Sequence, residues 1–327
     1  MIKKIFSLLL VISLNACFAQ ASSDLQIHFL SIPYGSEVLN LRIGIQNPDQ
    51  VAVGDILYIH GFGDRLDNHQ PLFRAWTKAG FRVIAFDLPS HGENSGTYND
   101  LNNFSFEELA ALAVKVEGET KPDTARPLIL SGWSTGGLVV VRMIQEKWMA
   151  DLSRPVSGVI LFAPGISVRK FPWTFGNRLG MVTEKTLTHD PHPPHVAPVR
   201  PDTPFWSHLA FQFSPRLVAE SILSQHRSYP TDIPTLIFTG GDAEDMYAKE
   251  WVVRSWIQEQ NRVRQSSQSS PIVNVACSGA RHELDNETES FGGLEVQNSS
   301  AAFAQAIAAG KLEMFSAGKD TFGKICK

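Results

Sequence analysis

The sequence predicts an α/β fold, in which a mostly parallel sheet is flanked by helices and carries an inserted lid. Over most of the chain, short apolar segments of strand length alternate with longer segments of helical pattern. This alternation is typical of a parallel sheet covered on both faces. It stops at about residues 167–230, where Pro, His and aromatic residues are frequent, and this stretch is too long for a plain loop. We therefore expect one domain over residues 22–327, with a lid at about 167–230.

The first 21 residues predict an export signal. Two lysines precede a ten-residue apolar run at 5–14, which is too short to span a bilayer. Residues 19–21 form an A-x-A site for ordinary signal peptidase. Residues 14–17 resemble a bacterial lipobox, in which Cys17 would be lipidated and would anchor the protein to a membrane. Either alternative predicts an exported protein, located in the bacterial cell envelope or secreted.

The amino-acid composition is that of a globular protein and argues against some kinds of partner. The 327 residues are 43% hydrophobic and 19% charged, and 20 Phe and 7 Trp supply material for a large core. The net charge is −4 and no basic run occurs, which argues against a nucleic-acid partner. No second apolar run of transmembrane length follows the signal. In an exported protein Cys277 and Cys326 could form a disulfide, but two unpaired cysteines are an equal alternative.

The elements follow from local patterns. Residues 25–32 and 38–45 predict two strands joined by a turn at 33–36. A helix at 70–78 should stop at Gly80, and Ser105 is a plausible cap for the next helix. The remaining strands are expected at residues 55–59, 81–86, 127–130, 156–162, 235–238 and 272–276. The remaining helices are expected at residues 106–117, 136–149, 248–260 and 301–315.

A nucleophile is predicted at Ser134. Gly132-Trp133-Ser134-Thr135-Gly136 follows an apolar strand directly and opens an apolar helix. In this context G-x-S-x-G predicts a sharp turn that exposes the serine at the edge of the sheet, with glycines where side chains would clash. Outside this context the same pattern would be an ordinary Gly-Ser turn.

A serine hydroxyl needs a base, and the base needs an acid that fixes its tautomer. His282 lies in the loop after the strand at 272–276, where the base is expected when the acid comes between serine and histidine in the chain. The acid should then follow the strand at 235–238. Asp242 lies nearest the end of that strand and is the first choice; Asp245 is the alternative.

An oxyanion hole is predicted beside Ser134. The segment 60–63 reads His-Gly-Phe-Gly at the end of an earlier strand, and its glycines allow the backbone to approach a reacting carbonyl. The amides of Phe62 and of Thr135, directly after the nucleophile, are the candidate donors. Taken alone, the segment could equally be a glycine turn.

Four motifs in order resemble those of one family. They are His-Gly-Phe-Gly-Asp at 60–64, the segment Phe-Asp-Leu-Pro-Ser-His-Gly-Glu-Asn-Ser-Gly at 86–96, the serine motif at 132–137, and His-Glu-Leu at 282–284 followed by Glu287. Over about residues 50–290 the chain resembles the monoacylglycerol lipase and lysophospholipase group of α/β-hydrolases, also described as serine aminopeptidase-like. The resemblance implies an α/β-hydrolase fold with Ser134 as nucleophile, His282 as base, and Phe62 and Thr135 as oxyanion donors. It gives Asp87 and His91 a structural place and no chemistry.

The expected activity is hydrolysis of a carboxylic ester through an acyl-serine, with no cofactor and no metal. Seven aromatic side chains of the lid suggest an apolar acyl pocket for a lysophospholipid, a monoacylglycerol or a short fatty ester; they are Phe171, Trp173, Phe175, Phe205, Trp206, Phe211 and Phe213. One alternative is an aminopeptidase that binds the substrate amine with lid carboxylates, of which Glu184, Asp190, Asp202 and Glu220 are available. The other is a non-catalytic binding protein on a hydrolase scaffold.

Overall fold

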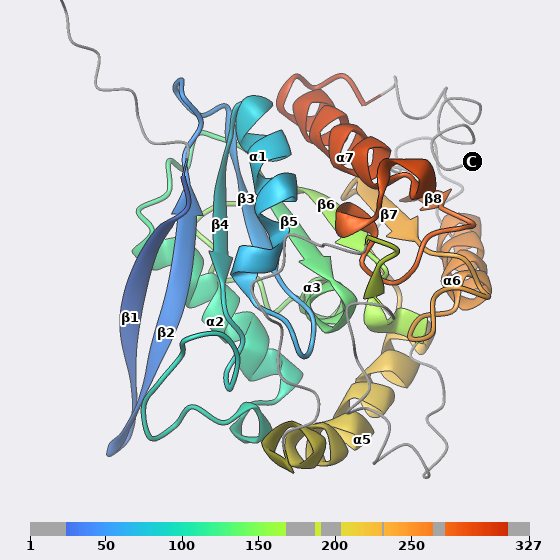
Figure 1. The fold of residues 1–327 in the computed structure, drawn as a ribbon. Helices are drawn as coiled ribbons and strands as arrows, with labels where there is room; N and C mark the ends of the chain where they lie inside the picture. Colours follow the sequence, from blue (N-terminus) through green and yellow to red (C-terminus); the bar gives the residue numbers. More distant parts are fainter. Residues whose placement is uncertain (1–23, 168–186, 191–203, 231, 264–271, 313–327) are drawn as a thin grey trace, which may run out of the picture.

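The computed structural model describes residues 24–167, 187–190, 204–230, 232–263 and 272–312 (Figure 1). The predicted signal, including Cys17, lies outside these residues, as do Cys326 and much of the predicted lid. Cys277 is buried and disulfide-bonded. Its pairing with Cys326 stays a prediction. In the described part of the chain, no helix is both long enough and apolar enough to cross a bilayer.

Eight strands form one sheet in the order β1-β2-β4-β3-β5-β6-β7-β8 (Figure 1). The first two strands pair antiparallel to each other, β2 pairs antiparallel to β4, and all other neighbours are parallel. The strands are β1 (Gln26–Tyr34), β2 (Glu37–Gln46), β3 (Gly54–Ile59), β4 (Phe81–Phe86), β5 (Leu128–Trp133), β6 (Val156–Phe162), β7 (Thr235–Thr239) and β8 (Ile272–Ala276). The predicted α/β class with a mostly parallel sheet is confirmed.

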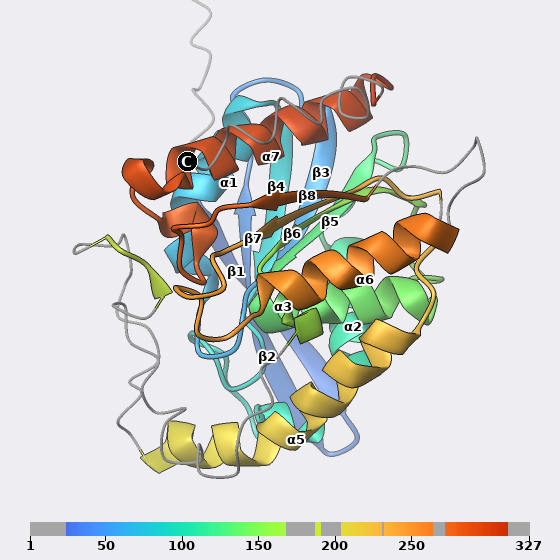
Figure 2. The ribbon, with the colours of Figure 1, turned by 90° about the vertical axis from the view of Figure 1, so that its right-hand side faces the viewer.

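Helices cover both faces of this sheet (Figure 2). The helices are α1 (Gln70–Lys78), α2 (Phe106–Glu119), α3 (Ser134–Gln145), α5 (Pro204–His226), α6 (Glu250–Val263) and α7 (Gly293–Ala308). Side chains of β3 alternate between two cores: Leu57 and Ile59 pack with α2, α3 and α6, whereas Ile56 and Tyr58 pack with α1 and α7. This alternation is the two-residue period of a strand that is buried on both faces.

Several helix boundaries differ from the sequence prediction. The predicted cap of α2 is present as a capping box, with the Ser105 hydroxyl accepting from the Glu108 amide and the Glu108 carboxylate accepting from the Ser105 amide. Helix α3 begins at Ser134 itself, two residues early, and α7 begins eight residues early. Within the segment predicted to be an irregular lid, α5 is a 23-residue helix that contains Pro215. Proline has no backbone N–H and removes one hydrogen bond from a helix, so a proline in a sequence argues against a helix at that position. For this reason the sequence did not predict α5.

Candidate active site

The predicted site residues follow four parallel strands at their carboxyl ends. Phe62 follows β3, Ser134 follows β5, Asp245 follows β7 and His282 follows β8. Parallel strands place their carboxyl ends at one edge of a sheet, where the loops of an α/β fold form its binding crevice. Residues up to 220 positions apart in the sequence therefore meet there.

Ser134 occupies a strained turn between β5 and α3. Its φ angle is 51°, in the left-handed region that side chains other than glycine seldom adopt. The turn is tight because a Cβ atom on Gly136 would lie 2.1 Å from the carbonyl oxygen of Ile59. Only glycine fits there, as the sequence motif predicts. The turn leaves Ser134 partly exposed at the edge of the sheet, while the residues on either side are buried.

A hydrogen-bonded relay runs from Ser134 to Asp245. The Oγ atom of Ser134 lies 2.8 Å from Nε2 of His282, and Nδ1 of His282 lies 3.0 Å from Oδ2 of Asp245. A carboxylate only accepts hydrogen bonds, so Nδ1 carries the proton and Nε2 accepts from the serine hydroxyl. The rings of Trp133 and Tyr247 flank the imidazole at 5.2 and 4.9 Å, which fixes its orientation. This geometry can activate a serine for attack on a carbonyl.

The structure places Asp245, the alternative for the acid, against His282, and it places the first choice, Asp242, elsewhere. Asp242 is exposed, and its carboxylate faces the Trp251 amide at 3.4 Å. The reason is a tight turn in which the Asp245 amide donates to the Gly241 carbonyl. This turn directs residues 242–244 outward and returns the chain to the site at Asp245, which is 1% exposed. The Tyr247 and Ala248 amides hold Oδ1 of Asp245, leaving Oδ2 for the histidine.

The candidate oxyanion donors lie beside the nucleophile. A Cβ atom on Gly61 would come within 3.0 Å of the Ser134 Cβ atom, so the backbone of the 60–63 segment adjoins the serine. Thr135 lies in the first turn of α3, where no side chain caps the helix. Amides in a first turn have no partner within their own helix and form its positive end. Phe62 and Thr135 thus belong to segments that adjoin Ser134, and their role as oxyanion donors stays a prediction.

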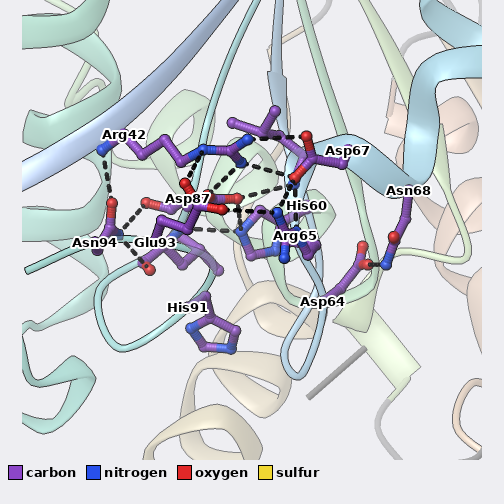
Figure 3. A network of polar contacts seen from close by, with 12 residues as sticks. Arg42, His60, Asp64, Arg65, Asp67, Asn68, Asp87, His91, Glu93 and Asn94 are labelled. Atoms are coloured by element: carbon purple, nitrogen blue, oxygen red, sulfur yellow. Dashed lines mark hydrogen bonds and ion pairs between the residues drawn. The ribbon is translucent and has the colours of Figure 1, made fainter. Parts of the chain in front are cut away.

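Two buried histidines, whose positions Figure 3 shows, link the Phe62 loop to the loop after β4. His60 accepts a hydrogen bond from the Leu88 amide, and His91 accepts one from the Gly63 amide, both at 2.9 Å. Each ring donates from Nδ1 to a main-chain carbonyl, of Gly61 and Pro89 respectively. Burial lowers the pKa of His60 to about 4 and that of His91 to about 3. Both rings are therefore neutral, as an accepting nitrogen requires.

A network of ion pairs also connects these two loops, through Arg42 of β2 (Figure 3). Arg42 on β2 donates to both carboxylate oxygens of Asp67, at 2.8 and 2.9 Å, and to Asp87 at 3.0 Å. Asp87 also accepts from the Leu66 amide. Asp87 and His91 thus have the structural place that the sequence implied for them. The role of Arg42 was not predicted, because the sequence gives no sign that β2 faces these loops.

The neutral state of His91 predicts an acid-dependent loss of stability. An unfolded histidine takes up a proton at about pH 6.5, whereas folded His91 does so only at about pH 3. The unfolded state therefore binds more protons between these values, and His91 lowers the free energy of unfolding as the pH falls through this window. His91→Gln keeps an acceptor for the Gly63 amide and removes the titration. Its melting temperature should fall less steeply between pH 6.5 and 4 than that of the wild type.

A matched control for this measurement is His28→Gln. His28 is an exposed residue of the edge strand β1, so the substitution also removes one histidine but leaves the links between the two loops intact. We expect the wild-type pH dependence in this variant. Equal slopes for His91→Gln and His28→Gln would contradict a neutral, buried His91.

One aromatic residue of the predicted lid can be placed against the site. Phe213 on α5 is buried and stacks on Phe62, with ring centres 5.7 Å apart, and on Phe106 at 6.1 Å. The other six predicted pocket aromatics are not described: Phe171, Trp173 and Phe175 lie outside the described residues, and the side chains of Phe205, Trp206 and Phe211 are likewise undescribed.

Residues 187–190 contact the His282 loop, where the Glu287 carboxylate accepts from the His189 amide and from the Arg281 amide.

One group of side chains in the described part of the chain has the spacing of metal ligands. Asp64, His69 and Glu283 each have one potential ligand atom within 4.8 Å of the others. However, the two ring nitrogens of His69 face carboxylates at 2.6 and 2.7 Å. Neither nitrogen then has a lone pair to offer, so this group fits an ion cluster better than a metal site. No residue signal in the sequence predicted this cluster.

A family model described as the alpha/beta hydrolase family matches residues 56–287, which is more than half of the chain. The chain belongs to the alpha/beta hydrolase family. The match includes the Phe62 loop, the serine turn, Asp245 and His282, and it confirms the fold that the sequence motifs implied. No curated protein matches the chain at a significant level.

Several solved structures are similar in fold to this alpha/beta hydrolase. A soluble variant of monoglyceride lipase from Saccharomyces cerevisiae, in complex with a substrate analog, is 18% identical, with 86% of this chain and 96% of that chain covered and a TM-score of 0.59. Monoacylglycerol lipase from Paleococcus ferrophilus is 20% identical, with 82% and 99% covered and a TM-score of 0.58. A carboxyl esterase from Bacillus coagulans is 17% identical, with 86% and 99% covered and a TM-score of 0.53. At these identities the similarity establishes the fold.

Proposed function

We propose that this alpha/beta hydrolase is a serine hydrolase of carboxylic esters. The single observation that carries the proposal is the relay from Ser134 through His282 to Asp245, at 2.8 and 3.0 Å. The sequence alternative of a non-catalytic binding protein is less favoured, because such a protein has no need of all three members in hydrogen-bonding order. No cofactor or metal takes part in the proposed reaction.

The proposed mechanism has two halves. His282 takes the proton of the Ser134 hydroxyl through Nε2 while Oγ attacks the ester carbonyl, and Asp245 stabilises the imidazolium that forms. The amides of Phe62 and Thr135 stabilise the negative charge on the carbonyl oxygen. Collapse expels the alcohol, which receives the proton from His282. Water then attacks the acyl-serine by the same steps, releasing the carboxylic acid and restoring Ser134.

We propose that the acyl group is apolar, as in a monoacylglycerol, a lysophospholipid or a short fatty ester. The ring of Phe213 stacks on the ring of Phe62, whose amide is a proposed oxyanion donor, so the surroundings of that donor are apolar. Two structures of the same fold carry the names of monoglyceride and monoacylglycerol lipases, which supports this substrate class. Apolar walls with few polar groups are typical of pockets for such ligands.

A graded series of p-nitrophenyl esters tests the substrate class. We expect kcat/KM to rise from the acetate toward longer chains, because each added methylene group that is buried contributes up to about 0.8 kcal/mol. A monoacylglycerol and a lysophospholipid assayed beside the series would identify the head group. A strict preference for the acetate would contradict an apolar acyl pocket.

The aminopeptidase alternative has weaker support. It needs lid carboxylates that are available to bind an amine. Of the four candidates, Glu220 is already paired with Arg142 at 2.7 Å, and Glu184 and Asp202 lie outside the described residues. The fourth, Asp190, is half-buried in the described segment 187–190. Release of proline amides faster than ester hydrolysis would favour this alternative.

We further propose that the protein is exported. Its first strand begins at Gln26, so removal of the predicted signal at either site would leave every described strand and helix in place. A disulfide at Cys277 also suits an oxidising compartment. The intact mass of the mature protein tests this: a chain beginning at Ser22 indicates ordinary cleavage, and an acylated chain beginning at Cys17 indicates a membrane anchor. A full-length chain in the cytosol would contradict export.

A further inference from the structure

A second buried histidine, His69, is hydrogen-bonded between two carboxylates next to the loops of the proposed site. Nε2 of His69 is 2.6 Å from Oδ2 of Asp64, and Nδ1 of His69 is 2.7 Å from Oδ2 of Asp285. His69 and Asp285 are fully buried, and Asp64 is 3% exposed. Carboxylates accept hydrogen bonds, so a histidine that donates from both nitrogens at once is an imidazolium.

The charges around His69 agree with that state. Burial alone would lower the pKa of His69, but the charges of Asp285 and Asp64 and the hydrogen bonds to them raise it well above the usual range. Burial would raise the pKa of Asp64, and the charge of His69 outweighs burial and holds it low. The titratable groups that face His69 from the surrounding elements are Asp64, Asp285, Glu283, Tyr58 and His60.

The two partners of His69 belong to the two loops that the proposed reaction must align. Asp64 lies two residues after Phe62, and its other oxygen accepts from Asn68 at 2.6 Å (Figure 3). Asp285 lies three residues after His282, in the short turn Leu284–Asn286. The Asn286 amide group adds a second link, donating to the Asn68 carbonyl at 2.9 Å.

The serine turn also contacts His69, through the ring of Trp133. The ring of Trp133, the residue before Ser134, has its centre 5.7 Å from His69 and 5.2 Å from His282. Its indole nitrogen donates to the His282 carbonyl at 2.9 Å. His69 thus contacts the oxyanion loop, the serine turn and the His282 loop from one buried point.

We infer that His69, held between Asp64 and Asp285, is a positioning residue that sets the oxyanion loop against the His282 loop. The inference deepens the proposed ester hydrolysis and rests on it. A displacement of about 1 Å between reacting groups can cost up to about 10²-fold in rate. Because the oxyanion amides and the base act mainly in the transition state, the loss should appear in kcat with KM little changed.

The test is a set of three variants assayed on a p-nitrophenyl ester. His69→Gln leaves one carboxylate without a donor and should lower kcat by about 10- to 10²-fold. Adding Asp285→Asn restores a neutral bridge, because the new Asn amide can donate to the glutamine carbonyl oxygen while the glutamine amide donates to Asp64. We expect this double variant to recover a large part of kcat.

Arg154→Gln is the matched control. Arg154 is 6% exposed and is paired with Asp55 at the amino end of β3, the edge of the sheet opposite the site. Removing it takes a cation from the buried Glu117 and one of the two cations, Arg154 and Arg82, from the buried Asp55, so a fall in melting temperature is expected here too. Its kcat should stay at the wild-type value. Equal kcat losses in Arg154→Gln and His69→Gln would overturn the inference, since they would indicate general destabilisation.

The charge state is read directly by NMR of protein labelled with ¹⁵N-histidine. We expect one ring signal with both nitrogens protonated at about pH 8, well above the ordinary histidine pKa of about 6.5, and this signal should be missing in His69→Gln. A neutral ring at position 69 would overturn the inference whatever the activity. If the wild type hydrolyses no ester, the proposed function fails; the rate of fluorophosphonate labelling in the same variants then replaces kcat in deciding the inference.

Discussion

Replacing Ser134 with Ala is expected to lower kcat for ester hydrolysis by about 10⁶. The hydroxyl is the attacking group, and the substitution removes the oxygen that lies 2.8 Å from Nε2 of His282. The proposed oxyanion amides remain. Without the serine oxygen, however, the negative charge that they would stabilise does not form. Steady-state kinetics on the best p-nitrophenyl ester measures the loss, and the melting temperature should stay near that of the wild type.

Ser131→Ala is the control for this loss. Ser131 lies on β5 three residues before the nucleophile, and its buried hydroxyl has no hydrogen-bond partner within the described part of the chain. Its removal deletes an equivalent hydroxyl oxygen three residues earlier in the chain without touching the relay. We expect wild-type kcat. Retained turnover in Ser134→Ala would mean that a different group attacks the ester.

Asp245→Asn is expected to lower kcat by about 10⁴. Its Oδ1 atom is held by the Tyr247 and Ala248 amides, so the new amide nitrogen would take the place of Oδ2 and donate to Nδ1 of His282. The histidine would then carry its proton on Nε2, facing Ser134, and could not accept the serine proton. KM should change little, because Asp245 does not touch the substrate in the proposed mechanism.

Asp242→Asn makes the same chemical change in the same loop. The Asp242 carboxylate is exposed and faces the Trp251 amide at 3.4 Å, away from the imidazole of His282. We expect kcat within about twofold of the wild type, as for a surface substitution away from special features. A large loss in Asp242→Asn with an active Asp245→Asn would reverse the assignment of the acid.

Local patterns were sufficient to predict the sheet and the positions of Ser134 and His282 at its edge. A strand buried on both faces is a short apolar run, and the G-x-S-x-G motif between strand and helix carries its own steric reason, since Gly136 abuts the Ile59 carbonyl. The position of His282 followed from the order of the strands. These features depend on neighbours in the sequence or on topology, so they could be predicted.

The aspartate that faces His282 and the His69 relay both depend on contacts that spacing does not encode. Asp242 is nearer the strand end, but the turn closed by the Asp245 amide on Gly241 reverses their order relative to the site. His69 and Asp285 are 216 positions apart, and only the packed fold brings them to 2.7 Å. Helix α5 was missed for a different reason, because Pro215 interrupts its pattern.

The most direct test of the account is the site of covalent labelling by a fluorophosphonate. The probe reacts with a serine that an adjacent base activates, so it reports the relay itself and needs no knowledge of the natural ester. Intact mass should show one adduct per chain, and peptide mapping should locate it on Ser134, with Asp245→Asn reacting far more slowly than Asp242→Asn. No adduct on the folded protein, or an adduct on another residue, would contradict the account.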